Sequence, residues 1–280
     1  MLNILISYAY IKDRHIGILK PLIDDGYCRL FLDSGAFTAF SSGKPIQLDD
    51  YCRFLEQMPI RPWRYFTLDV IGDPEKTMRN YETMVSRGFS PVPIVTLNDG
   101  GASLEAFYQT SDIVALGGLV GTPAKKRNAF IAKMMKAIKG RKVHWLGVVD
   151  DKMVKHFKPY SCDSSSVEGA GRFGTVNLYL GNGKHMTIGR DHFKSMPSAK
   201  IQNALKKYGL QLSDFSRKDN WRAAGDPLRK PFILANCHSY VLKSLDYEKH
   251  IGTKVFLAIG ADHTLQGVVD RYKKIKQMGV

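Results

Sequence analysis

Three short apolar runs in this sequence each end in an aspartate, a residue type that can do acid–base or nucleophilic chemistry. In parallel α/β proteins, a buried strand presents its last side chain at the carboxyl edge of the sheet, where catalytic groups gather. We therefore expect the side chains of Asp33, Asp69 and Asp163 to lie together at the carboxyl ends of the strands, which we call the mouth of the sheet. Converging carboxylates repel each other unless a cation or a reaction keeps them there. The three runs are Leu30–Asp33, Phe66–Asp69 and Tyr160–Asp163.

Two kinds of site fit this pattern. Oxygen ligands suit Mg²⁺ or Mn²⁺, whereas a pair of acids at a glycosidic carbon supplies one nucleophile and one proton donor. We favour the acid pair and expect no metal. Taken alone, Asp33 fits a helix cap or an Asx turn equally well. We interpret His144, which falls among the predicted strands, as a hydrogen-bonded core residue rather than a ligand.

Apolar runs alternate with amphipathic segments along the first 180 residues, and this alternation predicts the fold. Eight β–α alternations favour an α/β protein with a (β/α)8 TIM-type barrel over an open sheet. No dinucleotide-binding or Walker A glycine pattern is present, so we expect no cofactor. The strands are expected at Leu2–Ser7, Leu30–Asp33, Tyr65–Asp69, Val92–Leu97, Ile113–Leu119, Val143–Val148, Pro159–Cys162 and within Thr175–Leu180. The helices between them are expected at Ile16–Asp25, Leu48–Met58, Pro74–Gly88, Ala102–Thr110, Pro123–Ile138 and Lys152–Phe157.

The pattern changes after Gly174. The glycines around Asn182 predict a β-hairpin insertion at about 175–188. Beyond it, helices are expected near Ala199–Tyr208, Phe232–Tyr247 and Thr264–Lys276. We therefore divide the chain into a barrel catalytic domain, 1–196, and a small C-terminal helical subdomain without a zinc site, 197–280.

Composition narrows the class of protein. The 280 residues carry 41 Lys and Arg against 26 Asp and Glu, a net charge of +15, and such an excess favours a nucleic-acid partner. A generally basic, soluble surface is the competing interpretation. The four cysteines are widely spaced, which is typical of a reducing cytoplasm. No apolar run is long enough for a membrane span, and the first residues resemble a strand rather than a signal peptide.

Five segments together resemble the tRNA-guanine transglycosylase superfamily. Residues 33–37 are similar to its Asp-Ser-Gly-Gly-aromatic signature, and residues 145–147 to its Leu-Met-Gly segment. Asp69 falls at its base-recognising acid, Gly117-Gly118-Leu119 at its Gly-Gly-Leu loop and Asp163 at its nucleophile. The order and approximate spacing hold along residues 29–190. With its short form and the run Asp-Ser-Ser-Ser at residues 163–166, the sequence most resembles the DpdA-type enzymes. Many of these are phage-encoded, and they insert 7-deazaguanines into DNA.

The resemblance implies a role for each matching residue. Asp163 would attack the anomeric carbon of a guanosine, and Asp33 would protonate the departing guanine and then accept a proton from the incoming base. Asp69 would bind the base edge. The target nucleotide would have to leave the duplex. The expected substrate-binding residues are Ser34, Phe37, Asp69, Thr96, Gly117, Gly118, Leu119 and Leu146, with Phe37 and Leu146 on the two faces of the ring and backbone groups of Gly118 and Leu119 at its edge.

Departures from the family pattern bear on the substrate. Ala36 stands in place of the second signature glycine, and Thr38 stands in place of the glutamine that follows the signature. Another glutamine, expected after the fourth strand, is absent from the segment around Thr96. The Cys-x-Cys-x-x-Cys…His zinc site of the tRNA enzymes is missing, and Asn236-Cys237-His238 near the corresponding region cannot supply four ligands. We therefore expect a pentosyltransferase that exchanges guanine in DNA for a free 7-deazaguanine such as preQ0.

The sequence leaves three other interpretations of the function open, two of them enzymes and one a non-enzymatic protein. A tRNA-guanine transglycosylase would use the same site on tRNA, and a barrel nucleoside or glycoside hydrolase would use the same acids with water. A basic DNA-binding protein would need Asp33 and Asp163 only as caps. The expected partners are DNA, single-stranded or with a flipped-out guanine, and the free base, with no membrane. The sequence leaves open whether the chain forms a homodimer or needs a helper protein that opens the strands. The expected location is the cytoplasm, which would be that of the host cell if a phage encodes the chain.

Overall fold

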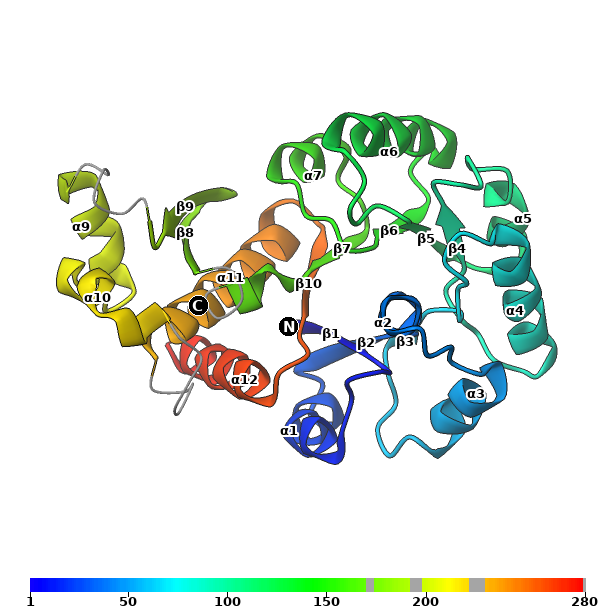
Figure 1. The fold of residues 1–280 in the computed structure, drawn as a ribbon, viewed down its shortest axis with the longest axis horizontal. Helices are drawn as coiled ribbons and strands as arrows, with labels where there is room; N and C mark the ends of the chain where they lie inside the picture. Colours follow the sequence, from blue (N-terminus) through cyan, green and yellow to red (C-terminus); the bar gives the residue numbers. More distant parts are fainter. Residues whose placement is uncertain (170–173, 192–197, 222–229, 279–280) are drawn as a thin grey trace.

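Eight parallel strands form one curled sheet in the computed structural model, which describes residues 1–169, 174–191, 198–221 and 230–278. The strand order is β3-β2-β1-β10-β7-β6-β5-β4, and every pairing in it is parallel. Figure 1 shows these strands arranged in a ring with most of the helices outside it and α2 (Ala36–Ser42) inside its outline. The strands are β1 Leu2–Ser7, β2 Cys28–Asp33, β3 Arg64–Tyr65, β4 Ile94–Thr96, β5 Ile113–Gly117, β6 Lys142–Trp145, β7 Ser161–Ser164 and β10 Lys254–Ala258.

The two edges of the curled sheet meet at a single point. Phe66 and Val92 form an isolated parallel bridge just beyond β3 and just before β4. The Val92 N–H donates to the Tyr65 carbonyl at 2.8 Å, and the Thr67 N–H donates to the Val92 carbonyl at 3.0 Å. The predicted α/β class and parallel sheet are thus confirmed. A fully closed (β/α)8 barrel stays a prediction, since this edge holds one bridge instead of a ladder.

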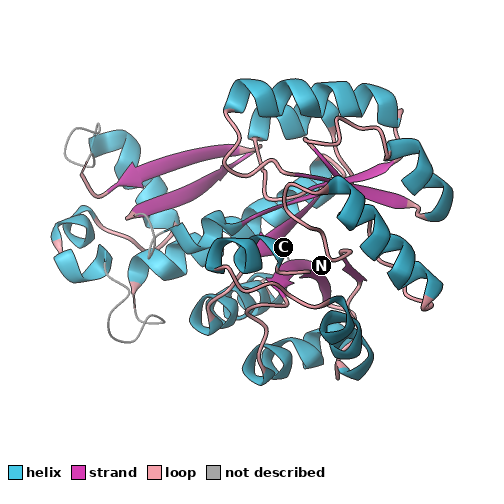
Figure 2. Cartoon of the chain, turned by 45° about the vertical axis from the view of Figure 1, so that its right-hand side comes forward, coloured by secondary structure: helices cyan, strands magenta, loops and turns pink. Residues whose placement is uncertain are grey.

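Helices follow most strands and cover the outside of the sheet (Figure 2). Their sequences explain their positions. In α6, buried Phe130, Ile131, Met134 and Ile138 recur at helical spacing, which gives the helix one apolar face for the sheet. The helices up to β7 are α1 Asp13–Asp24, α2 Ala36–Ser42, α3 Leu48–Gln57, α4 Pro74–Ser86, α5 Leu104–Thr110, α6 Ala124–Ile138 and α7 Asp151–Phe157.

The predicted hairpin is confirmed, but the predicted eighth strand is wrong. β8 Thr175–Gly181 pairs antiparallel with β9 Lys184–Gly189, and these two strands form a separate sheet. The place expected for the strand within Thr175–Leu180 is taken by β10, which pairs with β1 and β7. Residues 254–258 were expected to belong to the C-terminal helical subdomain. They form β10 instead, so that expectation is wrong there. The division at residue 196 stays a prediction.

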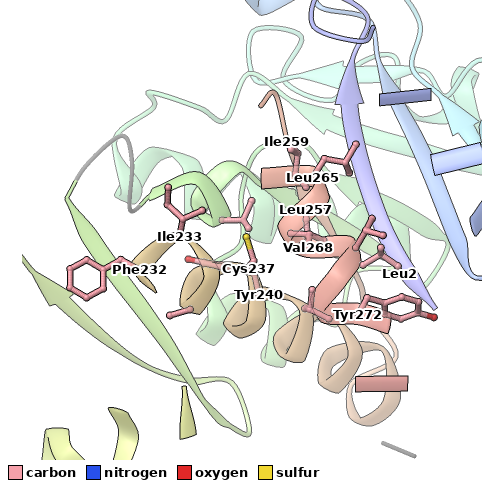
Figure 3. Close-up of a cluster of buried hydrophobic side chains, with 14 of the residues drawn as sticks. Leu2, Phe232, Ile233, Cys237, Tyr240, Leu257, Ile259, Leu265, Val268 and Tyr272 are labelled. Carbon is pink, nitrogen blue, oxygen red and sulfur yellow. The ribbon is translucent and has the colours of Figure 1, made fainter. Parts of the chain in front are cut away.

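Among the described residues, three of the four remaining helices match the expected ones closely, and the five-residue helix at Leu212–Ser216 was not expected. Figure 3 shows Ile233, Cys237 and Tyr240 of α11 in one cluster with residues of α12 and β10 and with Leu2 of β1. This cluster ties the C-terminal part of the chain to the sheet. A short 3-10 turn, Ser165–Glu168, follows β7, and another lies at Lys218–Trp221. The helices are α9 Ser198–Lys207, α10 Leu212–Ser216, α11 Pro231–His250 and α12 Asp262–Gln277.

Aromatic rings fill the interior of the curled sheet. Phe31 and Phe66 stack with their ring centroids 4.1 Å apart, and Phe256 lies 5.3 Å from Phe31. The three rings are fully buried and surround the His144 imidazole. They form an apolar floor beneath the carboxyl ends of the strands. No helix in the described part of the chain is long and apolar enough to cross a membrane.

Candidate active site

Asp163 is fixed at the mouth of the sheet through one of its two carboxylate oxygens. It lies on β7 between β6 and β10, with 4% of its surface exposed. Its Oδ1 accepts a hydrogen bond from the Gly147 N–H at 2.7 Å and lies 3.0 Å from His144 Nε2. No described residue donates a hydrogen bond to Oδ2 in this structure. One oxygen thus positions the side chain, and the other has no hydrogen-bond donor among the described residues.

The position of the proton on His144 follows from its two partners. An ionised carboxylate only accepts hydrogen bonds, so Nε2 must carry the proton that it shares with Asp163. Nδ1 then accepts from the Ser161 hydroxyl at 2.8 Å. Ser161, His144 and Asp163 form a buried chain, and a neutral imidazole satisfies it. His144 is a hydrogen-bonded core residue as predicted, but its contact with Asp163 was not foreseen.

Asp33 sits at the end of β2 with a perturbed acidity. The pKa of its carboxyl is raised to about 7, first by burial and then by the negative charges of Asp69 and Asp163. The Gly35 N–H, 3.1 Å from Oδ2, and the Ser7 hydroxyl act in the opposite direction, because hydrogen bonds favour the ionised form. A group that titrates near neutrality can both give and take a proton at cellular pH.

Asp69 lies in the segment after the Phe66 bridge and faces Asp33. Burial raises the pKa of Asp69 to about 6, while a hydrogen bond from the Ser34 hydroxyl, 3.0 Å from Oδ1, lowers it. The Asn80 amide holds this segment by donating to the Leu68 carbonyl at 2.8 Å. The negative charges of Asp69 and Asp163 both raise the pKa of Asp33, so the three carboxylates lie near one another at the ends of the strands.

Close packing accounts for two of the glycines at the strand ends. A Cβ added to Gly117 would lie 2.6 Å from Ile94 Cγ2, and one added to Gly147 would lie 2.4 Å from Val120 Cγ2. Gly147 also has a φ of +74°, so its N–H reaches Asp163 from a conformation that other residues rarely adopt. These contacts explain the glycines without a ligand. Approach of a flat ligand stays a prediction.

The remaining predicted site residues differ in what they can offer. Phe37 is 58% exposed on α2, whereas the Leu119 side chain is 1% exposed in the core, so that only its backbone can reach a ligand. Leu146 is half-buried and packs with the interior aromatic cluster. The Thr96 hydroxyl accepts from the Asp99 N–H at 3.3 Å. Gly118 has a φ of +69°, which turns the chain after β5.

The described residues contain no group of three or more His, Cys, Asp or Glu side chains arranged to hold a metal ion. Cys237 is buried, and its thiol points to the Thr264 carbonyl, 3.8 Å away. The magnesium or manganese site considered from the sequence therefore has no ligand cluster among these residues.

No protein-family model and no curated protein sequence matches this chain.

Proposed function

We propose that this chain is a pentosyltransferase that exchanges guanine in DNA for a 7-deazaguanine base, within a (β/α)8 barrel. The observation that carries the proposal is the pairing of Asp163, held at one oxygen, with Asp33, whose pKa is raised to about 7. A nucleophile and a proton donor at one mouth are the groups that double displacement at a glycosidic carbon requires.

The proposed reaction has two displacements. Asp163 Oδ2 attacks C1′ of the target deoxyguanosine, the bond from C1′ to N9 breaks, and Asp33 gives its proton to the departing guanine. The incoming 7-deazaguanine then loses its N9 proton to Asp33 and attacks C1′, which releases Asp163. Asp33 ends each cycle protonated, as it began. His144 and Gly147 keep Oδ1 occupied, so the carboxylate presents Oδ2 in both steps.

In this proposal, Asp69 and residues near it recognise the base. Asp69 would accept hydrogen bonds from N1–H and the exocyclic amine of either base, and the Ser34 hydroxyl holds it in place. Gly118 and Leu119 offer backbone groups to the other edge. Because incoming and outgoing bases share these features, one pocket can serve both displacements.

Exposed aromatic and basic residues at the mouth support a nucleic-acid substrate. Phe37, Phe40, Tyr10 and Val120 are 42–65% exposed on the segments that follow β1, β2 and β5. In Figure 1, α2, which carries both phenylalanines, lies inside the outline of the curled sheet. Aromatic rings with nearby cations stack unpaired bases and follow the phosphate backbone. The exposed lysines on the same segments are Lys12, Lys44, Lys125 and Lys126.

A covalent adduct is the sharpest test. The purified chain is incubated with a guanine-containing single-stranded oligonucleotide and quenched in acid, and the mass of the protein is measured. We expect a species heavier by the oligonucleotide less one guanine, absent from Asp163→Asn. Asp33→Asn, a neighbour of similar shape, should retain oligonucleotide binding and form the adduct slowly.

Exchange then separates the proposed enzyme from its alternatives. With labelled guanine in excess, we expect label to enter the oligonucleotide without accumulation of abasic sites, whereas a hydrolase would accumulate them. Parallel reactions with tRNA and with preQ0 compare the nucleic acids and the bases. Incorporation into tRNA alone would refute the DNA assignment, and no adduct with either nucleic acid would refute the transglycosylase.

A further inference from the structure

The positive charge of this chain is concentrated in one segment. Residues 124–158 hold eleven Lys and Arg against two Asp and no Glu, a net charge of +9, whereas the whole chain carries +15. Residues 44–110 hold seven Lys and Arg against nine Asp and Glu, a net charge of −2. A basic surface that served solubility alone would need no such asymmetry. The excess of positive charge therefore marks one side of the molecule.

Two adjacent helices carry this segment on the outside of the sheet. α6 follows β5 and α7 follows β6, and the two helices lie next to each other in Figure 1. Buried side chains of both helices pack in one apolar cluster with Val143 and Trp145 of β6. Across their amino ends, Arg127 Nη2 lies 3.9 Å from Asp150 Oδ2. The polar sides of the two helices therefore face outward together.

Lysines occupy the outward side of both helices. The buried residues of α6 are all apolar, and the helix contains no acidic residue. The exposed lysines of residues 124–158, which we call the basic face, are Lys125, Lys126, Lys133, Lys136, Lys139, Lys152, Lys155 and Lys158. None of them forms an ion pair with a described residue, whereas Arg127, Arg141 and Lys142 beside them each lie within 4.0 Å of an acid. Neighbouring like charges destabilise a helix, and an anion bound over them offsets the repulsion.

The basic face begins at the mouth of the sheet. The carboxyl ends of the strands form the mouth, so the helices that follow β5 and β6 begin there. Lys125 and Lys126 lie at the start of α6, and Lys152 lies at the start of α7. α7 also begins shortly after Gly147, whose N–H contacts Asp163. The remaining lysines continue from the mouth down the outside of the sheet.

The side chains of the basic face suit phosphates that are spaced along a polymer. Lysine is a flexible point charge that binds phosphate without reading a base. None of the large exposed hydrophobic side chains lies within residues 124–158, all of which are described. A helix that lies in a membrane surface needs such side chains. A polynucleotide backbone therefore fits this surface better than a lipid bilayer.

We propose that the basic face binds the sugar–phosphate backbone of the substrate strand on one side of its target nucleotide. The strand then leaves the mouth over α6 and α7, and not over α3, α4 and α5, whose segment has a net negative charge. α6 is about 22 Å long, and phosphates recur about every 3.4 Å along a strand of a duplex, so α6 spans roughly six of them. That this strand is a substrate rests on the proposed base exchange, whereas the binding itself does not.

Fluorescence anisotropy in the Asp163→Asn background tests the proposal with two labelled single strands, a trinucleotide with a central guanine and a 15-nucleotide strand with one guanine. The α6 variant combines Lys133→Gln, Lys136→Gln and Lys139→Gln. We expect it to bind the longer strand about 10- to 100-fold more weakly at about 50 mM salt, and the slope of log K against log salt to fall in magnitude by about 2. Binding of the trinucleotide should change less than about twofold, because three nucleotides do not extend beyond the mouth.

The α12 variant, Lys273→Gln with Lys274→Gln and Lys276→Gln, is the matched control. It removes the same charge from exposed positions near the end of α12, away from the mouth, and it should bind the longer strand nearly as wild type does. An equal loss in the α6 and α12 variants would overturn the proposal, since net charge alone would then explain binding. Tighter binding of the wild type to vesicles of phosphatidylserine and phosphatidylcholine than to the longer strand would also overturn it.

Charge reversal separates a loss of binding from a loss of folding. Lys125→Glu with Lys126→Glu places acids at the start of α6, which the helix dipole favours. The melting temperature should not fall, while binding of both strands weakens, and unchanged binding would overturn the proposal. Exchange assays keep the two proposals apart. Undiminished exchange on the longer strand at low concentration in the α6 variant would refute the basic face alone, and binding that depends on the basic face without any exchange would refute base exchange alone.

Discussion

The His144 imidazole lies 3.0 Å from Asp163 Oδ1, on the same oxygen that the Gly147 N–H reaches at 2.7 Å. Two donors on one oxygen orient the carboxylate, and the reaction proposed above uses the other oxygen. The Ser161 hydroxyl fixes the imidazole in turn. In the proposed reaction His144 would therefore act through Asp163, as a positioning residue.

Replacing His144 by Phe should slow adduct formation about 10- to 100-fold, because a hydrogen bond to a charged group contributes about 1.5–3 kcal/mol. The new ring enters a cluster that already contains Phe31 and Phe66, so it suits the site in shape. Single-turnover rates of adduct formation measure the effect. Ser161→Ala, which removes only the partner of Nδ1, should cause a smaller loss. An undiminished rate in His144→Phe would exclude the positioning role.

The sequence predicted the positions of the three aspartates better than it predicted their contacts. Strand-end positions place Asp33, Asp69 and Asp163 at one mouth because parallel strands share a carboxyl edge, and this was visible from the apolar runs. The contact between His144 and Asp163 depends on the pairing of β6 with β7, where His144 lies opposite Ser161. That register arises from the packing of distant segments, so no local pattern encodes it.

Local patterns also explain which elements were predicted. The apolar run Leu2–Ser7 gave β1 with its exact bounds, and the glycines beside Asn182 gave the hairpin. β10 was missed because Lys254–Ala258 is a five-residue run between two long helices, and it joins the sheet only through contacts with β1 and β7. Helix α2 was missed because the helix expected after Leu30–Asp33 was placed at Leu48–Met58, which is the position of α3.

Asp33→Asn should stabilise the fold above neutral pH while it slows exchange. In the folded chain Asp33 holds its proton up to a pH of about 7, whereas the unfolded chain releases it near 4. Asp33 therefore favours the unfolded state increasingly as pH rises from about 4 to 7. Asparagine removes that penalty, which we place on the order of 2 kcal/mol at pH 8 after allowance for solvent screening.

Urea unfolding of wild type and Asp33→Asn at pH 4 and pH 8 measures this difference. We expect the two midpoints to lie close together at pH 4 and Asp33→Asn to be the more stable at pH 8. Glu105→Gln is the matched control, because Glu105 is an exposed acid whose pKa is lowered by its hydrogen bond with Arg141, so its loss should not stabilise the fold at pH 8. A larger gain from Asp33→Asn at pH 4 than at pH 8 would show that the sign is wrong.

Gly147→Ala should destabilise the fold by about 1–3 kcal/mol and lower the exchange rate. The new methyl would lie 2.4 Å from Val120 Cγ2 at a φ of +74°, and the shift needed to relieve this contact moves the N–H away from Asp163. Gly121→Ala is the control, with a φ of +76° and nothing near its added Cβ. Val120→Ala should restore part of the loss in Gly147→Ala, and thermal unfolding with exchange assays measures both effects. Equal effects at Gly121 and Gly147 would leave backbone strain as the whole cause.

Phe40→Ala should weaken binding of a single-stranded oligonucleotide about 5- to 100-fold, since stacking contributes about 1–3 kcal/mol per base. The Phe40 side chain is 65% exposed, so its loss should leave the melting temperature almost unchanged. Fluorescence anisotropy in the Asp163→Asn background measures binding without turnover. Tyr27→Ala is the matched control. Tyr27 is 50% exposed and comes just before β2, so it lies at the amino ends of the strands, opposite the mouth. Because only a ring at the mouth can reach bases beside the target guanine, an equal loss in both variants would refute stacking by Phe40.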